Sequence, residues 1–229
     1  RNIANFTREQ FALAWTWMVQ CFMPSEIYPI VNMTGNAGAG KTWHSKMMKI
    51  ITDPNVVNAG VILSKKMTGD ELKLEAYVRH VLFLDNLSNL NEELSDTVCG
   101  ICTETKLSKR KLYTDGEIIE LPMQRPQILN GITDVATRGD VQDRTIHIEL
   151  SKLEQRQDEK TLNARFEQAR PYIFGSILDS LVIALQKRDS VELSKNTRLM
   201  NYAKIGTALE EMLGCLLYTS PSPRDAHES

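Results

Sequence analysis

Short apolar runs alternate with amphipathic segments through the middle of the chain. The runs that we predict as buried strands are 28–33, 61–63, 81–84, 127–130 and 145–150. The segments that we predict as helices between them are 41–51, 70–80 and 89–102. Strands that alternate with helices along a chain form parallel sheets. The pattern therefore predicts an α/β domain with a five-stranded, mostly parallel sheet.

Both flanks of this region are predicted to be helical. Thr7 and Gln10 have the spacing of a capping box, and Phe6 and Phe11 that of a hydrophobic staple, so a helix should begin there and run to about Pro24. Residues 155–214 predict further helices, broken near Pro171 and around 189–196. We expect a helical lead-in (1–27), a core (28–152) and a helical lid (153–214) that is truncated.

The segment 109–121 interrupts the alternation of strand and helix. It begins with Lys109, Arg110 and Lys111 and has Asp115-Gly116 at its centre, a pair that favours a tight hairpin turn. We predict an inserted β-hairpin. Adjacent cations of this kind usually form a solvated strand end, and contact with nucleic acid is the alternative.

Composition limits the classes of function. The chain has 229 residues, 42% of them hydrophobic, and a formal net charge of -2. One sizeable core is possible, and no overall charge attracts DNA or an anionic membrane. No apolar run approaches the roughly 20 residues that cross a bilayer, and no signal segment opens the chain. We expect a cytosolic, cytoplasmic protein without membrane contact.

The two ends of the chain carry signs of truncation. The sequence begins at Arg1 without a methionine, and we expect it to be a fragment. Residues 215–229 resemble the translation of a transposase sequencing adapter, so they are left out of the fold prediction. The alternative is a native, disordered tail rich in Ser and Pro.

The cysteines do not indicate a metal site. Cys99 and Cys102 have a spacing that occurs in zinc and redox sites, but no second Cys or His pair completes a set of ligands. We interpret both as small residues on one face of a helix.

A glycine-rich loop follows the first predicted strand. It consists of Gly35, Asn36, Ala37, Gly38, Ala39, Gly40, Lys41 and Thr42. The glycines let successive backbone N–H groups turn toward a phosphate at the start of a helix. Lys41 should contact the β- and γ-phosphates and Thr42 should coordinate Mg²⁺. The loop predicts binding of ATP with Mg²⁺; an ordinary glycine-rich turn is the alternative.

Asp85 directly follows the apolar run Leu82-Phe83-Leu84. In this position an acidic residue holds Mg²⁺ through water, although many strands end in an aspartate that caps a helix. The next residue, Asn86, can orient water but cannot act as a base. Hydrolysis would then be slow, would use another carboxylate such as Glu92 or Glu93, or would be absent.

Three further polar residues follow. Asn130 ends the next predicted strand, where a sensor between the γ-phosphate and the attacking water is expected; its alternative role is a turn before Gly131. Arg138 and Arg144 could each reach the ATP of a neighbouring subunit as an arginine finger. The alternative for both is an ion pair with Asp140 or Asp143.

Together these stretches resemble ATP-binding proteins of phages and mobile elements that are related to superfamily-3-type helicases, the motor half of primase-helicase proteins. The stretches that carry the resemblance are 35–42, 84–88, 110–115, 129–132 with 143–144, and 200–203. The resemblance implies an AAA+-like P-loop fold and a homo-oligomeric ring. The hairpin would project into the central channel, where Lys109, Arg110 and Lys111 would contact DNA phosphates.

The sequence departs from that family at two places. Asn86 stands where a catalytic glutamate is usual, and Asn130 is followed by Gly131 and Ile132 where the helicases have a nearby proline. The predicted function is the motor domain of a replication helicase-like ATPase, in which Mg²⁺-dependent ATP hydrolysis is coupled to DNA movement. The alternatives are an ATP-gated clamp for a nucleic acid or partner that does not hydrolyse ATP, and a small-molecule kinase.

Overall fold

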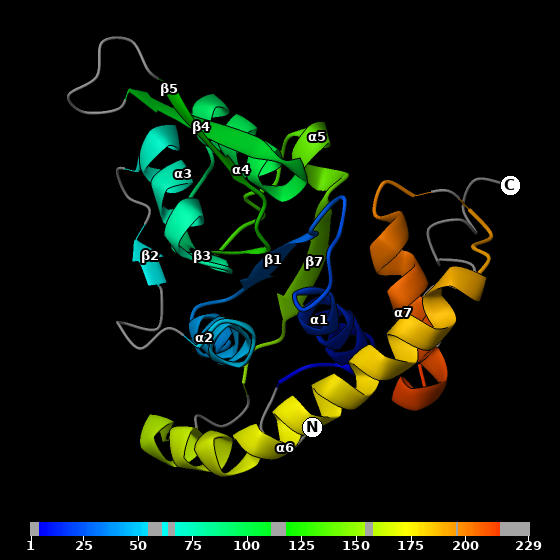
Figure 1. The fold of residues 1–229 in the computed structure, drawn as a ribbon. Coiled ribbons are helices and arrows are strands. Elements are labelled where there is room, and N and C mark those ends of the chain that lie inside the picture. Colours follow the sequence, from blue (N-terminus) through cyan, green and yellow to red (C-terminus); the bar gives the residue numbers. More distant parts are fainter. Residues whose placement is uncertain are drawn as a thin grey trace, which may run out of the picture. The chain divides into compact units, whose positions relative to one another are not determined.

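The computed structural model describes residues 5–54, 61–63, 67–110, 118–153, 158–195 and 197–215. The chain forms two compact units, Glu26–Lys152 and a unit made of Arg1–Ser25 with Leu153–Ser229. Figure 1 shows the strands in the first unit and long helices in the second. In the part of the chain that the structure describes, no helix has the length and apolar character to cross a membrane.

A parallel sheet forms the centre of the first unit. Its strands are β1 (Ile30–Gly35), β2 (Val61–Leu63), β3 (Leu82–Leu87), β6 (Gln127–Gly131) and β7 (Thr145–Leu150), in the order β2-β3-β6-β1-β7. Each neighbouring pair is parallel. The predicted α/β class with a parallel sheet is confirmed.

Helices cover both faces of this sheet. They are α2 (Lys41–Thr52), α3 (Gly69–Val78), α4 (Glu92–Thr103) and the short α5 (Gly139–Gln142). Ile30 belongs to a core cluster that includes Leu72 of α3 and Val98 of α4, whereas Met33 lies against Ser45 of α2. Since residues three apart on a strand face opposite sides, α2 lies on one face and α3 with α4 on the other (Figure 1).

Polar caps set the start of two of these helices. Thr68 and Glu71 form a capping box at α3, and Asn91 accepts from the N–H of Leu94 at the start of α4. Cys99 and Cys102 are buried residues of α4, which agrees with their interpretation as small residues at helical spacing. Among the described residues, no group of three or more His, Cys, Asp or Glu could hold a metal ion.

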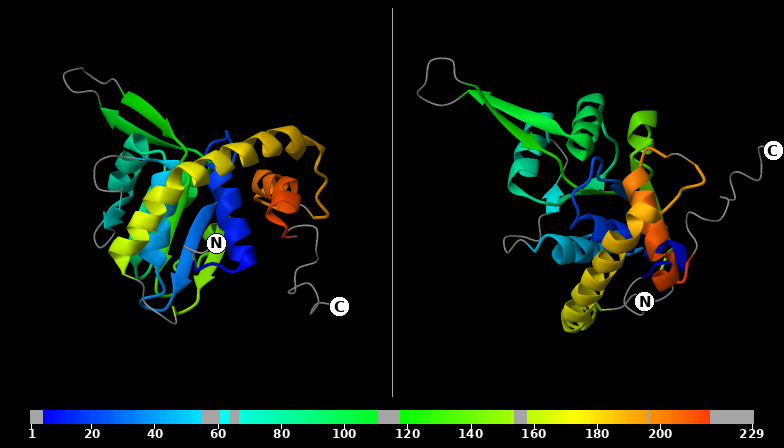
Figure 2. Two further views of the ribbon diagram at one scale, coloured as in Figure 1. Left: turned by 90° about the horizontal axis from the view of Figure 1, so that it is seen from below. Right: turned by 45° about the vertical axis from the view of Figure 1, so that its right-hand side comes forward.

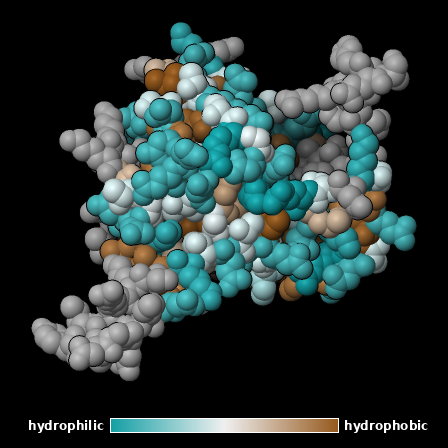
Figure 3. Space-filling model, turned by 90° about the horizontal axis from the view of Figure 1, so that it is seen from above, coloured by the Kyte–Doolittle hydropathy of each residue, from teal (hydrophilic) through white to brown (hydrophobic). Residues whose placement is uncertain are grey.

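A two-stranded antiparallel sheet follows α4. It consists of β4 (Thr105–Arg110) and β5 (Ile118–Met123), in register from Thr105 with Met123 to Arg110 with Ile118. In both views of Figure 2 these strands extend away from the parallel sheet. The predicted turn at Asp115-Gly116 and the cation Lys111 lie outside the described residues. The molecular face in Figure 3 is mostly hydrophilic, with hydrophobic residues in small, separate groups.

The second unit is helical. It contains α1 (Arg8–Gln20), α6 (Glu159–Lys187), the 3-10 helix η2 (Arg188–Ser190) and α7 (Met200–Leu213). The predicted capping box at Thr7 is confirmed, since Thr7 and Gln10 exchange hydrogen bonds. Two long-range contacts join the helices: Trp15 Nε1 donates to Ser180 Oγ at 2.9 Å, and Tyr202 donates to the Leu13 carbonyl at 2.9 Å.

The predicted helix break near Pro171 is wrong. Helix α6 runs through Pro171 without interruption. A proline removes one backbone hydrogen bond from a helix. In α6, buried residues lie on both sides of it, Phe166 before and Ile177, Ser180 and Ala184 after. Burial of these side chains offsets the free-energy cost of the hydrogen bond that is lost at Pro171. The second predicted break, around 189–196, falls between α6 and α7.

Candidate functional site

The loop from Gly35 to Thr42 joins β1 to α2 in a conformation that needs its glycines. Gly35, Gly38 and Gly40 have positive φ angles of 139°, 81° and 87°, values that residues with a Cβ rarely adopt. A Cβ on Gly35 would also lie 2.5 Å from the carbonyl oxygen of Leu150. The backbone of the predicted phosphate-binding loop therefore requires glycine at these three positions. Helix α2 begins at Lys41, within the last two residues of the loop.

Lys41, the first residue of α2, reaches back over this loop. Its Nζ donates to the carbonyl oxygens of Gly35 at 2.7 Å and Asn36 at 3.2 Å. Partial burial lowers the pKa of the Lys41 amine, and the nearby carboxylate of Asp85 partly opposes that shift. The amine is thus held at the mouth of the loop by carbonyl groups that a stronger acceptor, such as a phosphate, can replace.

His44 lies one turn into α2. It is buried, and its Nδ1 lies 2.8 Å from the carbonyl oxygen of Gly40. Burial lowers the pKa of His44, an effect that the bond to Gly40 partly offsets. Because a carbonyl only accepts, the neutral ring must carry its hydrogen on Nδ1. His44 thereby ties the first turn of α2 to the last glycine of the loop.

Asp85 on β3 is the centre of the polar contacts at this edge of the sheet. Its Oδ1 accepts from Thr42 Oγ1 at 3.1 Å, Asn130 Nδ2 at 3.1 Å and the backbone N–H of Asn86 at 3.0 Å. Among the described residues, no donor meets the other carboxylate oxygen, Oδ2. The structure therefore brings together Thr42, Asp85 and Asn130, which the sequence proposes separately.

Strand β3 extends further than predicted. The expected end was Leu84, but the strand continues to Leu87 with a register shift between Leu84 and Leu87 against β6. The shift coincides with Asn86, whose φ is 59°, in the left-handed region. Asn86 accordingly leaves its side chain exposed at the edge of the site.

A cavity of about 350 Å³ opens at these residues. Its lining combines the loop, the carboxyl ends of β3 and β6 and the residues after β6: Ala37, Lys41, Thr42, Asp85, Asn86, Asn130, Gly131 and Ile132. In open parallel sheets, ligands bind outside the carboxyl ends of the strands. The volume lies within the range of small-molecule sites, roughly 300–1,000 Å³.

Glu92 and Glu93, the two carboxylates considered as substitutes for a base, do not line this cavity. Glu93 Oε1 accepts from the backbone N–H of Gly69 at 2.8 Å and so lies toward α3. The Glu92 carbonyl accepts from Arg138 at 3.3 Å. Asp85 is thus the sole acidic residue in the lining formed by the described residues.

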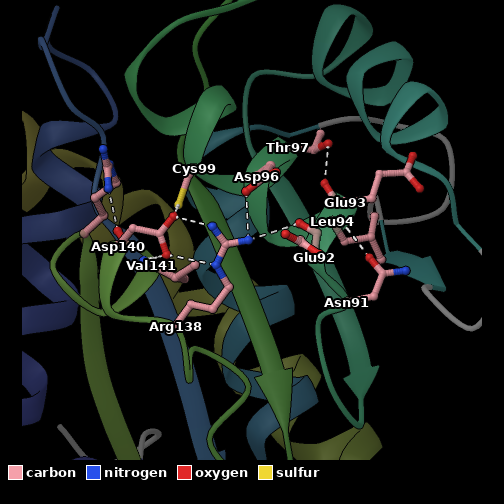
Figure 4. A network of polar contacts seen from close by, with 11 residues as sticks. Asn91, Glu92, Glu93, Leu94, Asp96, Thr97, Cys99, Arg138, Asp140 and Val141 are labelled. Atoms are coloured by element: carbon pink, nitrogen blue, oxygen red, sulfur yellow. Dashed lines mark hydrogen bonds and ion pairs between the residues drawn. The ribbon is translucent and has the colours of Figure 1, made fainter.

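Arg138 is held by carboxylates (Figure 4) and is not among the described residues that line the cavity. Its guanidinium forms ion pairs of 2.8 Å with Asp96 and with Asp140. The hydrogen bonds to Asp140 and then to Asp96 raise the pKa of Arg138. The alternative role considered for this residue, an ion pair with Asp140, is therefore present, and Asp96 is a partner that the sequence did not single out.

Arg144 lies at the opposite edge of the sheet from the loop. Its carbonyl accepts from the N–H of Ile30 at 2.8 Å, and Ile30 is the first residue of β1. The loop begins at Gly35, which is the last residue of β1. The Arg144 side chain donates from Nη1 to the Asp140 carbonyl at 2.5 Å. Its buried Nε meets no acceptor among the described residues. Arg144 therefore does not contribute to the cavity of its own chain.

Lys109 and Arg110 belong to β4. Ser45 contacts the predicted residues although the sequence did not single it out. It is fully buried on α2 and donates from Oγ to Asn130 Oδ1 at 2.8 Å. Its position four residues after Lys41, on the same face of the helix, is the only signal in the sequence.

Two solved structures have a similar fold. One, described as "SCCmec type IV Cch - active helicase", has a TM-score of 0.51 at 14% identity and covers 91% of this chain and 44% of that one. The other, "The A form apo structure of NrS-1 C terminal region-CTR", has a TM-score of 0.52 at 13% identity, covering 75% and 42%. The present chain thus spans less than half of either. The chain shares its α/β fold with these two structures.

The family follows from a second comparison. The model of the actinomycete integrative conjugative element replication protein family matches residues 1–221. The chain belongs to this family of replication proteins of mobile elements. No curated protein matches its sequence.

Proposed function

We propose that this chain is the ATP-binding motor domain of the replication protein, with an AAA+-like P-loop core. The observation that carries the proposal is the contact of Thr42 with Asp85 beside Lys41 in one cavity. A nucleoside triphosphate and its metal ion are bound by a lysine, a hydroxyl group and a carboxylate at the carboxyl ends of parallel strands. Membership of a replication protein family supports the same conclusion.

The donor set fits Mg²⁺. This ion prefers oxygen ligands and keeps several of its waters. Thr42 would supply a hydroxyl, and the Oδ2 of Asp85 can accept from a metal-bound water. When bound, Mg²⁺ neutralises charge on the phosphates and polarises the γ-phosphoryl group. Lys41 would exchange the carbonyls of Gly35 and Asn36 for the β- and γ-phosphates, with the N–H groups of Asn36, Ala37, Gly38, Ala39 and Gly40 around them.

Hydrolysis would depend on how water is oriented. Asn86 and Asn130 both line the cavity and could each hydrogen-bond a water next to the γ-phosphate. No second carboxylate belongs to the described lining, which favours slow turnover. The alternative function is an ATP-gated clamp. The clamp would bind ATP without hydrolysing it and would hold a nucleic acid or a partner.

Assembly into a ring would complete the site. Arg144 lies at the edge of the sheet opposite the cavity, where it could meet the ATP of a neighbouring copy and stabilise charge on the transferred phosphoryl group. In such a ring Lys109 and Arg110 of β4, together with Lys111 that follows them in sequence, would contact DNA phosphates, and the helices of 153–214 would act as a lid. Movement of these strands with the nucleotide state would couple hydrolysis to DNA.

Phosphate release with and without single-stranded DNA tests the proposal. Wild type should release phosphate faster with DNA, and Lys41→Ala should abolish release. Lys73→Ala is the matched control, because Lys73 pairs on the surface of α3 with Asp70, whose side chain is 80% exposed. ATP binding without release above background would favour the clamp. Transfer of phosphate to an added small-molecule acceptor, with no release to water, would favour the kinase.

A further inference from the structure

Four side chains next to the cavity are linked in a chain by three hydrogen bonds. Thr42 and Asn130 each donate to Asp85 Oδ1 at 3.1 Å, and Ser45 donates to Asn130 Oδ1 at 2.8 Å. Thr42 and Ser45 are three residues apart on α2, so they lie on one face of that helix. This hydrogen-bonded chain therefore joins the first turn of α2 to the ends of β3 and β6.

The hydrogen bonds to Asn130 allow only one orientation of its amide. An ionised carboxylate only accepts hydrogen bonds, so the group of Asn130 that faces Asp85 must be the NH₂. The carbonyl oxygen of the amide then faces Ser45, whose hydroxyl can donate to it. Met33 Sδ, 3.5 Å from the Ser45 oxygen, is the other nearby acceptor, and a thioether is a weak one.

From this geometry we infer that Ser45 is a positioning residue for γ-phosphate recognition, an inference that rests on the proposed nucleotide site. Ser45 and Asn130 are 0% and 1% exposed, so bulk water does not replace the hydroxyl. Together with Asp85, which binds the NH₂ group, Ser45 holds the carbonyl end of the amide and so restrains the amide hydrogens on the side of Asp85 and the cavity. One of them bonds Asp85, and no second acceptor among the described residues meets the other.

That second amide hydrogen is the group that would contact a γ-phosphate oxygen. ADP has no such oxygen, so the contact makes the site prefer ATP over ADP. Without the Ser45 hydroxyl, the buried carbonyl of Asn130 loses its donor, and the bond to Asp85 alone restrains the amide. A charge-assisted hydrogen bond of this kind is worth about tenfold in affinity. Ser45→Ala should therefore lower the preference for ATP about tenfold and leave ADP affinity unchanged.

The test is equilibrium binding of Mg²⁺-ADP and of the Mg²⁺ complex of a non-hydrolysable β,γ-imido ATP analogue. The proteins are wild type, Ser45→Ala, Asn130→Ala and the double variant. Because Ser45 acts through Asn130, the two single variants should lose the same preference, and the double variant should lose no more. Thr52→Val is the control. It removes another buried hydroxyl of α2, which bonds only the carbonyls of Met48 and Lys49, and it should behave as wild type.

The outcomes separate the inference from the proposed function. If wild type binds neither nucleotide, the proposed site is wrong, and the inference with it. If wild type binds both nucleotides equally, or Ser45→Ala keeps the preference, the nucleotide site stands and the role of Ser45 is refuted. Equal loss of ADP and analogue affinity in Ser45→Ala would show a structural role only, and that also refutes the inference.

Discussion

Thr42 and Asp85 are 43 residues apart in sequence, yet the hydroxyl of one donates to the carboxylate of the other at 3.1 Å. The contact exists because β1 and β3 both flank β6 and end at the same edge of the sheet. It places a hydroxyl and a carboxylate where one Mg²⁺ with its waters could contact both.

The carboxylate of Asp85 should be needed for the metal dependence of the site. Asp85→Asn keeps an oxygen that can accept from Thr42 and from the N–H of Asn86, so the loop should retain its structure. The charge that attracts Mg²⁺ is lost. We expect phosphate release to fall at least about 100-fold, which corresponds to about 2.7 kcal/mol in the barrier. Titration of the rate with Mg²⁺ measures the effect, and an unchanged Mg²⁺ dependence would contradict it.

Gly35 should not tolerate a side chain. Gly35→Ala places a Cβ 2.5 Å from the Leu150 carbonyl oxygen at a φ of 139°, so we expect about 2–3 kcal/mol of destabilisation in urea unfolding. The matched control is Gly139→Ala. A Cβ there meets nothing within 4 Å, and the unfolding free energy should stay the same or rise by up to about 1 kcal/mol. Equal stability of the two variants would refute the proposed clash.

A buried ion pair should stabilise the far end of α2. Lys49, which is 0% exposed, pairs with Asp53, and Asp53 Oδ2 also accepts from the N–H of Val81 at 3.0 Å. Asp53→Asn leaves the Lys49 charge buried without this carboxylate, so we expect a loss of about 3 kcal/mol. Asp70→Asn removes the exposed partner of Lys73 and should change stability by less than about 0.5 kcal/mol.

The same pair predicts a dependence on pH. Burial alone would raise the pKa of Asp53, but the bonds from Lys49 and Val81 outweigh it and lower the pKa below the ordinary value of 3.8. The unfolded chain therefore takes up the proton first as the pH falls. The contribution of Asp53 is complete above about pH 4 and is lost as the pH falls further toward the lower, folded pKa. The unfolding free energy of Asp53→Asn, measured as a function of pH, should lack this decrease at acid pH.

Local features of the fold were predictable from the sequence, whereas contacts between distant elements were not. The loop at Gly35–Thr42 and the strands were predictable because apolar runs and glycine spacing are local signals. The contact of Ser45 with Asn130 spans 85 residues, and the pair of Arg138 with Asp96 joins α4 to the start of α5. Such partners depend on the packing of distant elements. Helix α6 was predicted to break because a local rule for Pro171 did not include the burial on either side of it.

The role of Arg144 can be tested by mixing subunits. Lys41→Ala and Arg144→Ala should each be inactive in phosphate release. A mixed ring would contain interfaces with an intact Lys41 on one side and an intact Arg144 on the other, about a quarter of the total in an equal random mixture. Activity should return to about that fraction. No recovery, or an active Arg144→Ala variant alone, would contradict a role in trans.

Calorimetric titration of the wild-type protein with ATP in the presence of Mg²⁺ tests the central claim most directly. Wild type should bind one ATP per chain. Lys41→Ala should weaken binding at least about 100-fold, the value of a charge-assisted contact to phosphate, while Lys73→Ala should bind as wild type does. Absence of ATP binding by wild type, or equal affinity in Lys41→Ala, would contradict the account.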